Sequence, residues 1–394
     1  MDDFGAEHAR GCAILTDGDA LRVDVVTPGA VDARFRAAWR SLDSDLAIPN
    51  PFFSQWFLGP ALNRLAAGGQ VRLCTVTRRR DGALVGLFPF EIGTRYARLP
   101  LRHVSVWQNP HGYNGTPLLR RGYSPAALAA ILDWIDRRPF GARFLRLTRL
   151  PYGPEMRGVV GEACARADRV PRLQSRILRA CLSAGEDHDA LMAAAMPGKK
   201  RKELRRQARR FGELGAARFV DLPMSDPAIL RAAEQFVALE NAGWKASAAH
   251  GEPLARSADE RAFFIEAMRA GAGQGAVSCL ALMLDADPVA MLFCLRSGSH
   301  LSAFKTTYDE RHAAYSPGMR LLIEASARML ADLDSAHLDS CARPGHPVVD
   351  RLWPQRLPVV QLNIPTSHAG DAALLDLAAI VERAKQRVLV RTQS

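Results

Sequence analysis

Several common functional signatures are missing from this 394-residue sequence. Its seven cysteines are scattered and include no Cys-x-x-Cys pair, so neither a disulfide framework nor a zinc knuckle is expected. The histidines show no His-Glu-x-x-His pattern, and we therefore expect no metal. A Gly-x-Ser-x-Gly elbow and a Gly-x-x-x-x-Gly-Lys-Ser/Thr loop are both absent. These absences argue against a serine hydrolase of the α/β type and against a P-loop nucleotidase.

Long apolar runs are missing as well. No run reaches the roughly 18 residues that a membrane-spanning helix needs. The first three residues, Met1-Asp2-Asp3, are acidic, and no apolar signal core follows them. Apolar residues make up 48% and charged residues 24% of the chain, which is typical of a protein that buries a full core. We expect a soluble, cytoplasmic protein without a transmembrane segment.

The net charge of +11 is concentrated in one segment. Residues 199–210 read KKRKELRRQARR, with eight basic residues and a single acidic one. Leu204, Ala208 and Phe211 fall on one side of a helix, so residues 199–213 are expected to form an amphipathic helix with a cationic outer surface. That surface is either merely solvated, or it binds an acidic partner such as a nucleic acid, an anionic membrane or a polyanionic substrate.

The predicted elements follow one order twice along the chain. In the first half they are strand Leu21–Val26, helices near Val31–Leu42 and Phe53–Ala66, hairpin Val71–Thr77 with Ala83–Ile92, loop Asn109–Pro117, helix Pro125–Arg137, strand Ala142–Leu147, helix Glu155–Ala167 and strand Leu173–Leu182. In the second half they are strand Ala217–Asp221, helices Pro227–Gly243 and Ser257–Ala270, strands Ala276–Leu284, Val289–Arg296 and Leu301–Tyr308, loop Glu310–Pro317, helix Gly318–Leu333, strand Ala336–Asp339, helix Pro347–Leu352 and strand Pro358–Ile364. This order predicts an α/β fold with mixed (α+β) sheets, made of two copies of one domain at residues 1–184 and 185–394.

One loop of the second half has the features of an anion site. Ser316 is a candidate N-cap, Pro317 suits the first helical position, and Gly318 lets an anion approach the backbone. The helix dipole and the free N–H groups favour a pyrophosphate there, and Arg320 adds a charged contact. The alternative is an ordinary capped helix. The glycine-rich stretch 271–275 instead connects a helix to a strand, which predicts a simple turn.

The C-terminal stretch 371–388 has leucine, isoleucine, valine and alanine on helical spacing. We expect a helix that packs on its own domain. The alternative is a helix through which two copies of the chain form a homodimer.

Three segments resemble the branch of the GNAT acyltransferase superfamily that includes the CelD protein of bacterial cellulose-biosynthesis clusters. They are Pro51–Phe57 (PFFSQWF), the basic stretch Lys199–Gly215 with Trp244-Lys245, and Lys305–Asp309 through Tyr315–Gly318 followed by Asp339 and Trp353. The resemblance spans most of residues 50–365. It implies two tandem GNAT-like domains, of which the second retains the acyl-CoA site.

The resemblance also implies site residues. The residues that would hold the CoA pyrophosphate are Tyr315, Ser316, Gly318, Met319 and Arg320. The first copy would be degenerate and would shape the acceptor groove. The usual Arg/Gln-x-x-Gly-x-Gly/Ala signature is missing, and Asp350-Arg351 stand where relatives carry Tyr-Lys. These departures admit the related Fem-type aminoacyl transferases, which have tandem domains and take the acyl group from tRNA.

The resemblance therefore implies an N-acyltransferase that moves an acyl group, expected to be acetyl, from acyl-CoA to an amine, with a place in polysaccharide or cell-envelope biosynthesis. Asp339 is the candidate base, and Lys305 and Tyr308 are candidates for substrate positioning and thiolate protonation. A structural ion pair or a core phenol explains each of these three equally well. The residues expected to contact a small-molecule or polyanionic acceptor are Trp244, Arg205 and Arg209. Two alternatives remain: a tRNA-dependent transferase, and a non-catalytic binding or assembly protein with a decayed site.

Overall fold

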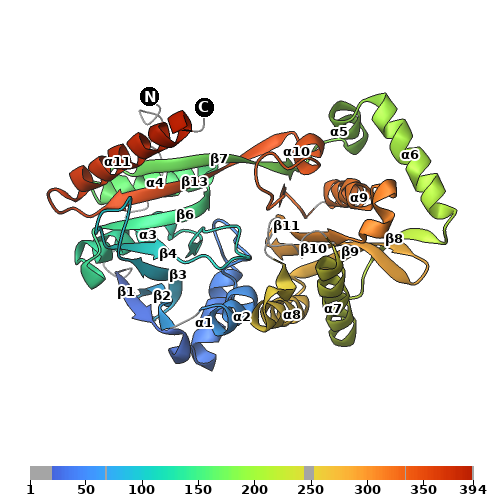
Figure 1. Cartoon of the computed structure of the whole chain (residues 1–394). Helices are drawn as coiled ribbons and strands as arrows, with labels where there is room; N and C mark the ends of the chain where they lie inside the picture. Colours follow the sequence, from blue (N-terminus) through green and yellow to red (C-terminus); the bar gives the residue numbers. More distant parts are fainter. Residues whose placement is uncertain (1–19, 67–68, 244–252, 333, 393–394) are drawn as a thin grey trace.

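The computed structural model describes residues 20–66, 69–243, 253–332 and 334–392 (Figure 1). The elements of the first half are β1 (Leu21–Val26), α1 (Ala33–Asp43), α2 (Gln55–Arg64), β2 (Arg72–Arg78), β3 (Leu84–Gly93), β4 (His103–Val106), β5 (Leu118–Leu119), α3 (Ser124–Asp136), β6 (Phe144–Pro151), α4 (Pro154–Arg166) and β7 (Arg172–Ser183). Those of the second half are α5 (His188–Ala195), α6 (Gly198–Gly212), β8 (Ala217–Asp221), α7 (Asp226–Ala242), α8 (Ala258–Ala272), β9 (Val277–Leu284), β10 (Asp287–Ser297), β11 (His300–Tyr308), η7 (Glu310–Tyr315), α9 (Pro317–Ala331), β12 (His337–Asp339), α10 (Val349–Leu352), β13 (Gln355–Pro365) and α11 (Asp371–Thr392).

The described strands form one mixed sheet of 13 strands in the order β1-β2-β3-β4-β6-β13-β7-β12-β11-β10-β9-β8, with β5 paired to β3. The two ends of this order mirror each other. In both halves a meander of antiparallel strands leads to a parallel pair, which is β4 with β6 in the first half and β11 with β12 in the second. The mixed α/β fold and its repeated order, expected from the sequence, are therefore confirmed.

The last strands of the two halves are exchanged. Strand β13 lies between β6 and β7 and is antiparallel to both, whereas β7 pairs with β12 of the second half. Each half thus completes the sheet with a strand from the other, and Figure 1 shows β7 and β13 running across the middle of the molecule. The division at residues 184 and 185 separates the two repeated orders and stays a prediction, because the hydrogen-bonded sheet continues across it.

The two halves also share a core. Phe57 of α2 packs edge-to-face against Phe263 of α8 and Phe304 of β11, with ring centroids 5.2 and 5.4 Å apart. All three rings are almost completely buried. Aromatic pairs of this geometry add to the free energy gained from burying their area. The relative placement of the halves is therefore fixed by apolar packing as well as by the shared strands.

The C-terminal helix packs on β13 of its own half and also against the first half, so the expectation that it covers its own domain holds only in part. Leu375 and Ala378 of α11 are buried against a cluster formed by Tyr96, Leu101 and Phe144. The exchange of β13 explains this, because α11 follows directly after a strand that lies beside β6. Among the described residues, no helix is both long and apolar enough to cross a bilayer.

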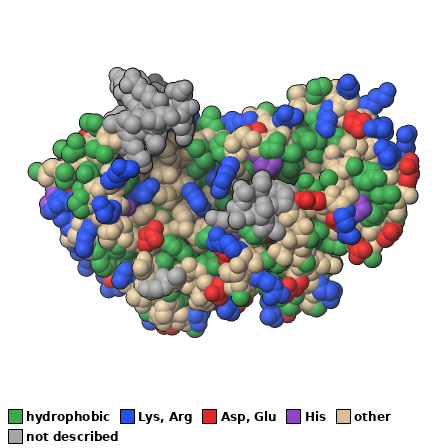
Figure 2. Space-filling view, in the orientation of Figure 1, with side chains coloured by type: hydrophobic (Ala, Val, Ile, Leu, Met, Phe, Trp, Pro, Cys, Tyr) green, Lys and Arg blue, Asp and Glu red, His purple; other side chains and the backbone are tan. Residues whose placement is uncertain are grey.

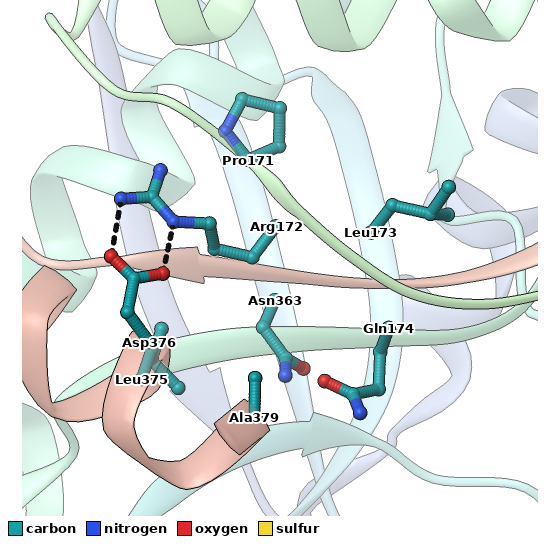
Figure 3. A pocket seen from close by; sticks show the side chains of 8 residues that line it. All are labelled: Pro171, Arg172, Leu173, Gln174, Asn363, Leu375, Asp376 and Ala379. Atoms are coloured by element: carbon teal, nitrogen blue, oxygen red, sulfur yellow. Dashed lines mark hydrogen bonds and ion pairs between the residues drawn. The ribbon is translucent and has the colours of Figure 1, made fainter. Parts of the chain in front are cut away.

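A groove of about 300 Å³ separates α11 from the start of β7 (Figure 3). Its wall includes a two-pronged ion pair in which Arg172 Nε and Nη2 donate to the two Asp376 oxygens, at 2.8 and 3.1 Å. Asn363 of β13 lies at its floor and donates from Nδ2 to the Tyr96 hydroxyl at 2.8 Å. These contacts attach α11 to the exchanged strands.

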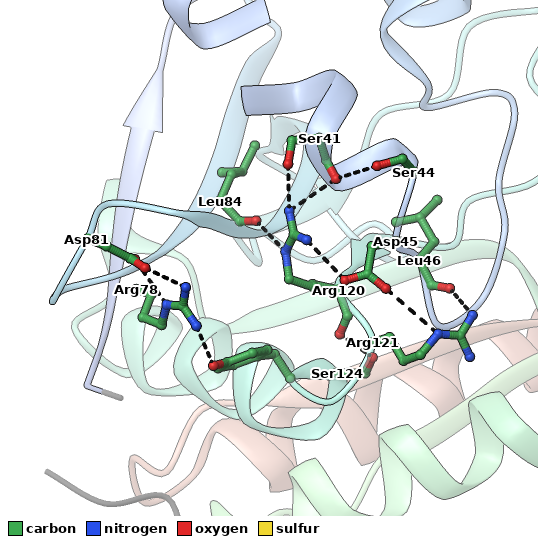
Figure 4. Close-up of polar contacts among 11 residues, drawn as sticks. Ser41, Ser44, Asp45, Leu46, Arg78, Asp81, Leu84, Arg120, Arg121 and Ser124 are labelled. Carbon is green, nitrogen blue, oxygen red and sulfur yellow. Dashed lines mark hydrogen bonds and ion pairs between the residues drawn. The ribbon is translucent and has the colours of Figure 1, made fainter. Parts of the chain in front are cut away.

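The sequence analysis did not predict strand β4. Two arginines, Arg120 and Arg121, hold the segment that follows this strand (Figure 4). Arg120 donates from Nε to the Leu84 carbonyl at 3.2 Å and from Nη1 to Asp45 at 3.0 Å. Arg121 donates to the Leu46 carbonyl at 2.9 Å. These contacts fix the far end of the loop 109–117, which reaches toward the second half.

Candidate active site

Strands β11 and β12 of the second half separate part of the way along their length. They pair in parallel only from His300 with His337 to Ser302 with Asp339. The rest of β11, Ala303–Tyr308, continues beside β10 alone. A notch therefore opens in the sheet beyond Ser302, and β11 leads from it through η7 to the start of α9.

The first half closes its equivalent notch with its own chain. Strands β4 and β6 pair at only two positions, Val104 with Leu145 and Ser105 with Arg146. Beyond them, the N–H of Gly115 donates to the Arg149 carbonyl at 2.9 Å. A Cβ on Gly115 would lie 1.9 Å from the Thr148 carbonyl oxygen, so only glycine allows this approach. That the first copy is degenerate stays a prediction.

The N-terminus of α9 lies where the sequence places it, but Ser316 does not act as a capping side chain. Ser316 adopts the left-handed conformation (φ 52°, ψ 48°) and makes no side-chain cap hydrogen bond. Pro317 opens the helix as expected. The first N–H groups of a helix have no partner within the helix, and a left-handed residue before them helps to form an anion-binding concavity. Gly318 packs against a ring, since its Cβ would lie 3.2 Å from Tyr308 Cδ1.

Arg320 is one turn further along α9 and is held between aromatic rings. Its Cζ lies 5.1 Å from the centroid of Phe211 and 5.8 Å from that of Phe219. Burial lowers the pKa of this guanidinium from its ordinary value. Nη1 is buried and has no hydrogen-bond partner among the described residues. A buried, unsatisfied cationic donor of this kind is suited to an anionic ligand.

The basic helix α6 packs directly on this loop. Phe211 contacts the rings of His312 and Tyr315 in η7, with centroids 5.6 and 5.5 Å apart. Arg205 and Arg209 are exposed on the outer side of α6. In Figure 2 the Lys and Arg side chains gather over the position that α6 has in Figure 1. Met319 is half-buried in the core under α9, and Trp244 lies outside the described residues.

The three predicted catalytic residues lie on the two strands that border the notch: Asp339 on β12, and Lys305 and Tyr308 on β11. Asp339 ends β12 and is almost completely buried. Its Oδ2 accepts from Arg179 Nη1 at 2.8 Å, and its Oδ1 accepts from the Cys341 N–H at 2.9 Å. Lys305 is buried on β11, three residues beyond the last paired position, and Tyr308 is half-buried at the end of the same strand.

Arg179 is a residue of this region that no sequence pattern singles out. It comes from the exchanged strand β7, and its side chain is only 5% exposed. Nη1 donates both to Asp339 and to the Tyr113 carbonyl, the latter at 3.0 Å. Arg179 therefore connects β12 with the loop of the first half. No linear pattern pairs it with Asp339, because the pairing depends on the strand exchange.

A second cavity, of about 140 Å³, lies under α9, and its lining includes Leu301 of β11 and Leu338 of β12. It is bordered by ion pairs of Arg328 with Asp221 and of Arg296 with Asp332. In the part of the chain that the structure describes, no group of three or more His, Cys, Asp or Glu side chains could hold a metal ion. Burial raises the pKa of Cys294, which borders this cavity, to about 12, so its thiol is protonated.

The comparisons with known proteins agree with this geometry. Residues 198–342 match the family described as acetyltransferase (GNAT) domain. The matched segment extends from the start of α6 to just beyond β12, and it includes the notch and the start of α9. No curated protein matches the sequence.

Two solved structures share the fold along nearly the whole chain. The crystal structure of FemX has a TM-score of 0.53 at 10% identity and covers 87% of this chain and 98% of FemX. A conserved protein of unknown function from Bacteroides thetaiotaomicron VPI-5482 has a TM-score of 0.52 at 11% identity and covers 84% of this chain and 97% of its own. At these identities the likeness shows the fold alone. That fold is a mixed α/β fold in which one order of elements occurs twice.

Proposed function

We propose that the second half transfers an acyl group, in the simplest case acetyl, from CoA to an amine. The observation that carries this proposal is the notch between β11 and β12, which leads directly to the start of α9. GNAT domains use such a notch for the pantetheine arm and the following helix for the pyrophosphate. Ser316, Gly318 and the unsatisfied Nη1 of Arg320 fit an anion at this place. Tyr315 and Met319 flank the same turn.

The reaction needs little covalent chemistry from the protein. The nitrogen of a neutral amine attacks the thioester carbonyl, the C–S bond breaks, and the thiolate takes up a proton as the amide forms. The enzyme must orient both substrates and stabilise the developing oxyanion. Lys305 has the charge for the oxyanion, and Tyr308 has an acidic proton for the thiolate. Both roles are part of the proposal.

Asp339 is proposed as the base, but its contacts supply a competing role. Both carboxylate oxygens accept hydrogen bonds, and the ion pair with Arg179 holds β7, β12 and the Tyr113 carbonyl together. A base needs an oxygen that can reach the amine proton. We therefore place the positioning role of Asp339 above the base role.

The proposal is tested by following thiol release. Purified protein is incubated with acetyl-CoA and a panel of primary amines, namely amino acids, amino sugars and polyamines, and free CoA is measured with a thiol reagent. We expect release that depends on one class of amine and that is lost in the variant Arg320→Met. Release that is equal with and without any amine, or unchanged in the variant, would contradict the proposal.

A second candidate function is supported by the position of α6. The basic helix packs through Phe211 on the loop that is proposed to bind the acyl donor. Its cations therefore lie near the proposed binding site of the donor. A donor with many phosphates, such as an acylated tRNA, would use them, and Arg205 and Arg209 would then contact the donor instead of the acceptor. A place in polysaccharide or cell-envelope biosynthesis, a polyanionic acceptor and pairing of two copies through α11 rest only on the sequence expectations.

A further inference from the structure

His111 is a buried histidine to which the reaction scheme above gives no role. It belongs to the loop 109–117 of the first half, and its side chain lies against α8 of the second half. Its ring stacks on Phe263 of α8, with centroids 5.6 Å apart and planes 7° from parallel. The residue is 0% exposed. The backbone N–H is satisfied by Asn109 Oδ1 at 2.8 Å, so the loop itself is well ordered around it.

Both ring nitrogens of His111 lack a hydrogen-bond partner among the described residues. The nearby carboxylate oxygen, Glu260 Oε1, is 3.9 Å from Nε2, beyond hydrogen-bond reach. Glu260 is held instead by Arg256, at 2.5 Å. Leaving a buried polar group unsatisfied costs about 1–3 kcal/mol. A chain that keeps such a group is expected to use it.

The surroundings of His111 keep its ring neutral. Burial, and then the charges of Lys305 and Arg256, lower the pKa of His111 to about 2. A neutral imidazole offers a lone pair that can accept a hydrogen bond from an N–H group. Tyr113 of the same loop has its ring centroid 6.1 Å from that of Phe304. Phe304 belongs to the part of β11 that lies beyond the pairing with β12, so the loop that carries His111 reaches the notch.

We propose that His111 positions the acceptor amine. One ring nitrogen of His111 accepts a hydrogen bond from an N–H of the neutral amine, and this orients the lone pair of the amine nitrogen toward the thioester carbonyl held in the notch. This inference rests on the proposed acyl transfer and names the acceptor class as a neutral primary amine. Glu260 approaches the other ring nitrogen and fixes the tautomer when the amine binds. Apo structures often show such contacts lengthened. The first half thus supplies an essential side chain to the site of the second.

The matched control for His111 is His103, the other buried and stacked histidine of the first half. Its ring lies 4.6 Å from that of Phe144 with planes 9° apart, and it is 3% exposed. Unlike His111, it makes a hydrogen bond through Nδ1, to the Leu101 carbonyl at 3.0 Å. His103→Phe removes a satisfied nitrogen, whereas His111→Phe removes two unsatisfied ones and keeps the stack.

The experiment compares His111→Phe, His111→Asn and His103→Phe. We expect His111→Phe to unfold at or above the wild-type temperature, to keep its affinity for acetyl-CoA, and to lose about 10–100-fold in kcat/KM for the amine. His111→Asn, which retains an acceptor near the Nδ1 position, should recover part of that loss. The wild-type rate should rise with pH as the amine loses its proton, without a histidine step. His103→Phe should unfold at a lower temperature with unchanged kinetics.

Two outcomes would overturn the proposal. One is a fall in unfolding temperature for His111→Phe as large as that for His103→Phe, with kinetics unchanged, which would show a structural hydrogen bond. The other is the absence of amine binding, which is measured separately if the wild-type protein transfers acetyl to no amine and the proposed acyl transfer itself fails. His111 is then judged from ¹⁵N-histidine spectra titrated with n-propylamine. A shift that is absent in His111→Phe supports amine binding, and no shift refutes it.

Discussion

The buried ion pair between Arg179 and Asp339 allows one prediction with a magnitude. Their side chains are 5% and 9% exposed, and the Nη1–Oδ2 distance is 2.8 Å. Removing one member of a buried pair leaves an uncompensated charge and costs about 3–5 kcal/mol, whereas replacing both members with apolar residues is often nearly neutral. We therefore expect Arg179→Met and Asp339→Asn each to lower the free energy of unfolding by about 3–5 kcal/mol, and Arg179→Met/Asp339→Leu to recover most of that loss.

The assay is urea unfolding followed by circular dichroism, with acyl transfer measured under conditions where each variant is folded. If Asp339 positions the notch, the double variant regains stability and retains transfer within about tenfold, a barrier change of about 1.4 kcal/mol. If Asp339 is the base, the double variant regains stability but transfer stays about 100-fold or more below wild type. Single variants within about 1 kcal/mol of wild type would refute the reasoning about the ion pair.

The remaining predictions concern a buried carboxyl and the basic helix. Burial raises the pKa of Asp43 from 3.8 to about 7, so the stability that its neutral form contributes is present below about pH 4 and lost as the pH rises through 7. In Asp43→Asn the free energy of unfolding should therefore vary less between pH 4 and 8, by at most about 4 kcal/mol. A pH profile of stability like that of the wild type would disprove this prediction. Replacing Arg205, Arg206 and Arg209 by Gln should leave the affinity for acetyl-CoA unchanged. If the donor is a tRNA, the same variant should bind RNA with a weaker dependence on salt concentration than the wild type. Absence of RNA binding by the wild type would leave α6 as a solvated surface.

The order of elements could be predicted from the sequence because it depends on local patterns. Strands β1 and β8 begin and end at the predicted residues, and the hairpins and the helices before them differ from the predictions only at their ends. The alternation of apolar residues and the turn residues at Asp81-Gly82 carry that information. The candidate donor loop could be found in the same way, because Pro317 marks the start of a helix after a long strand.

The features that build the notch could not be predicted, because they depend on contacts far apart in the sequence. The exchange of β7 and β13 joins residues on opposite sides of the division at 184 and 185. It places Arg179 beside Asp339 and moves α11 onto the first half. The burial of His111 depends on how the halves pack together. The left-handed conformation of Ser316 has no residue-type signal, since glycine or asparagine usually occupies such a position.

The account rests on a CoA site at the start of α9, and isothermal titration calorimetry with acetyl-CoA tests it most directly. The matched variants are Arg320→Met, which removes the unsatisfied guanidinium, and Arg328→Met, which removes an arginine of the same helix that is already paired with Asp221 and Glu324. We predict one site per chain, at least about tenfold weaker in Arg320→Met, or about 1.4 kcal/mol, and nearly unchanged in Arg328→Met. No binding to the wild type, or equal binding to all three proteins, would contradict the account.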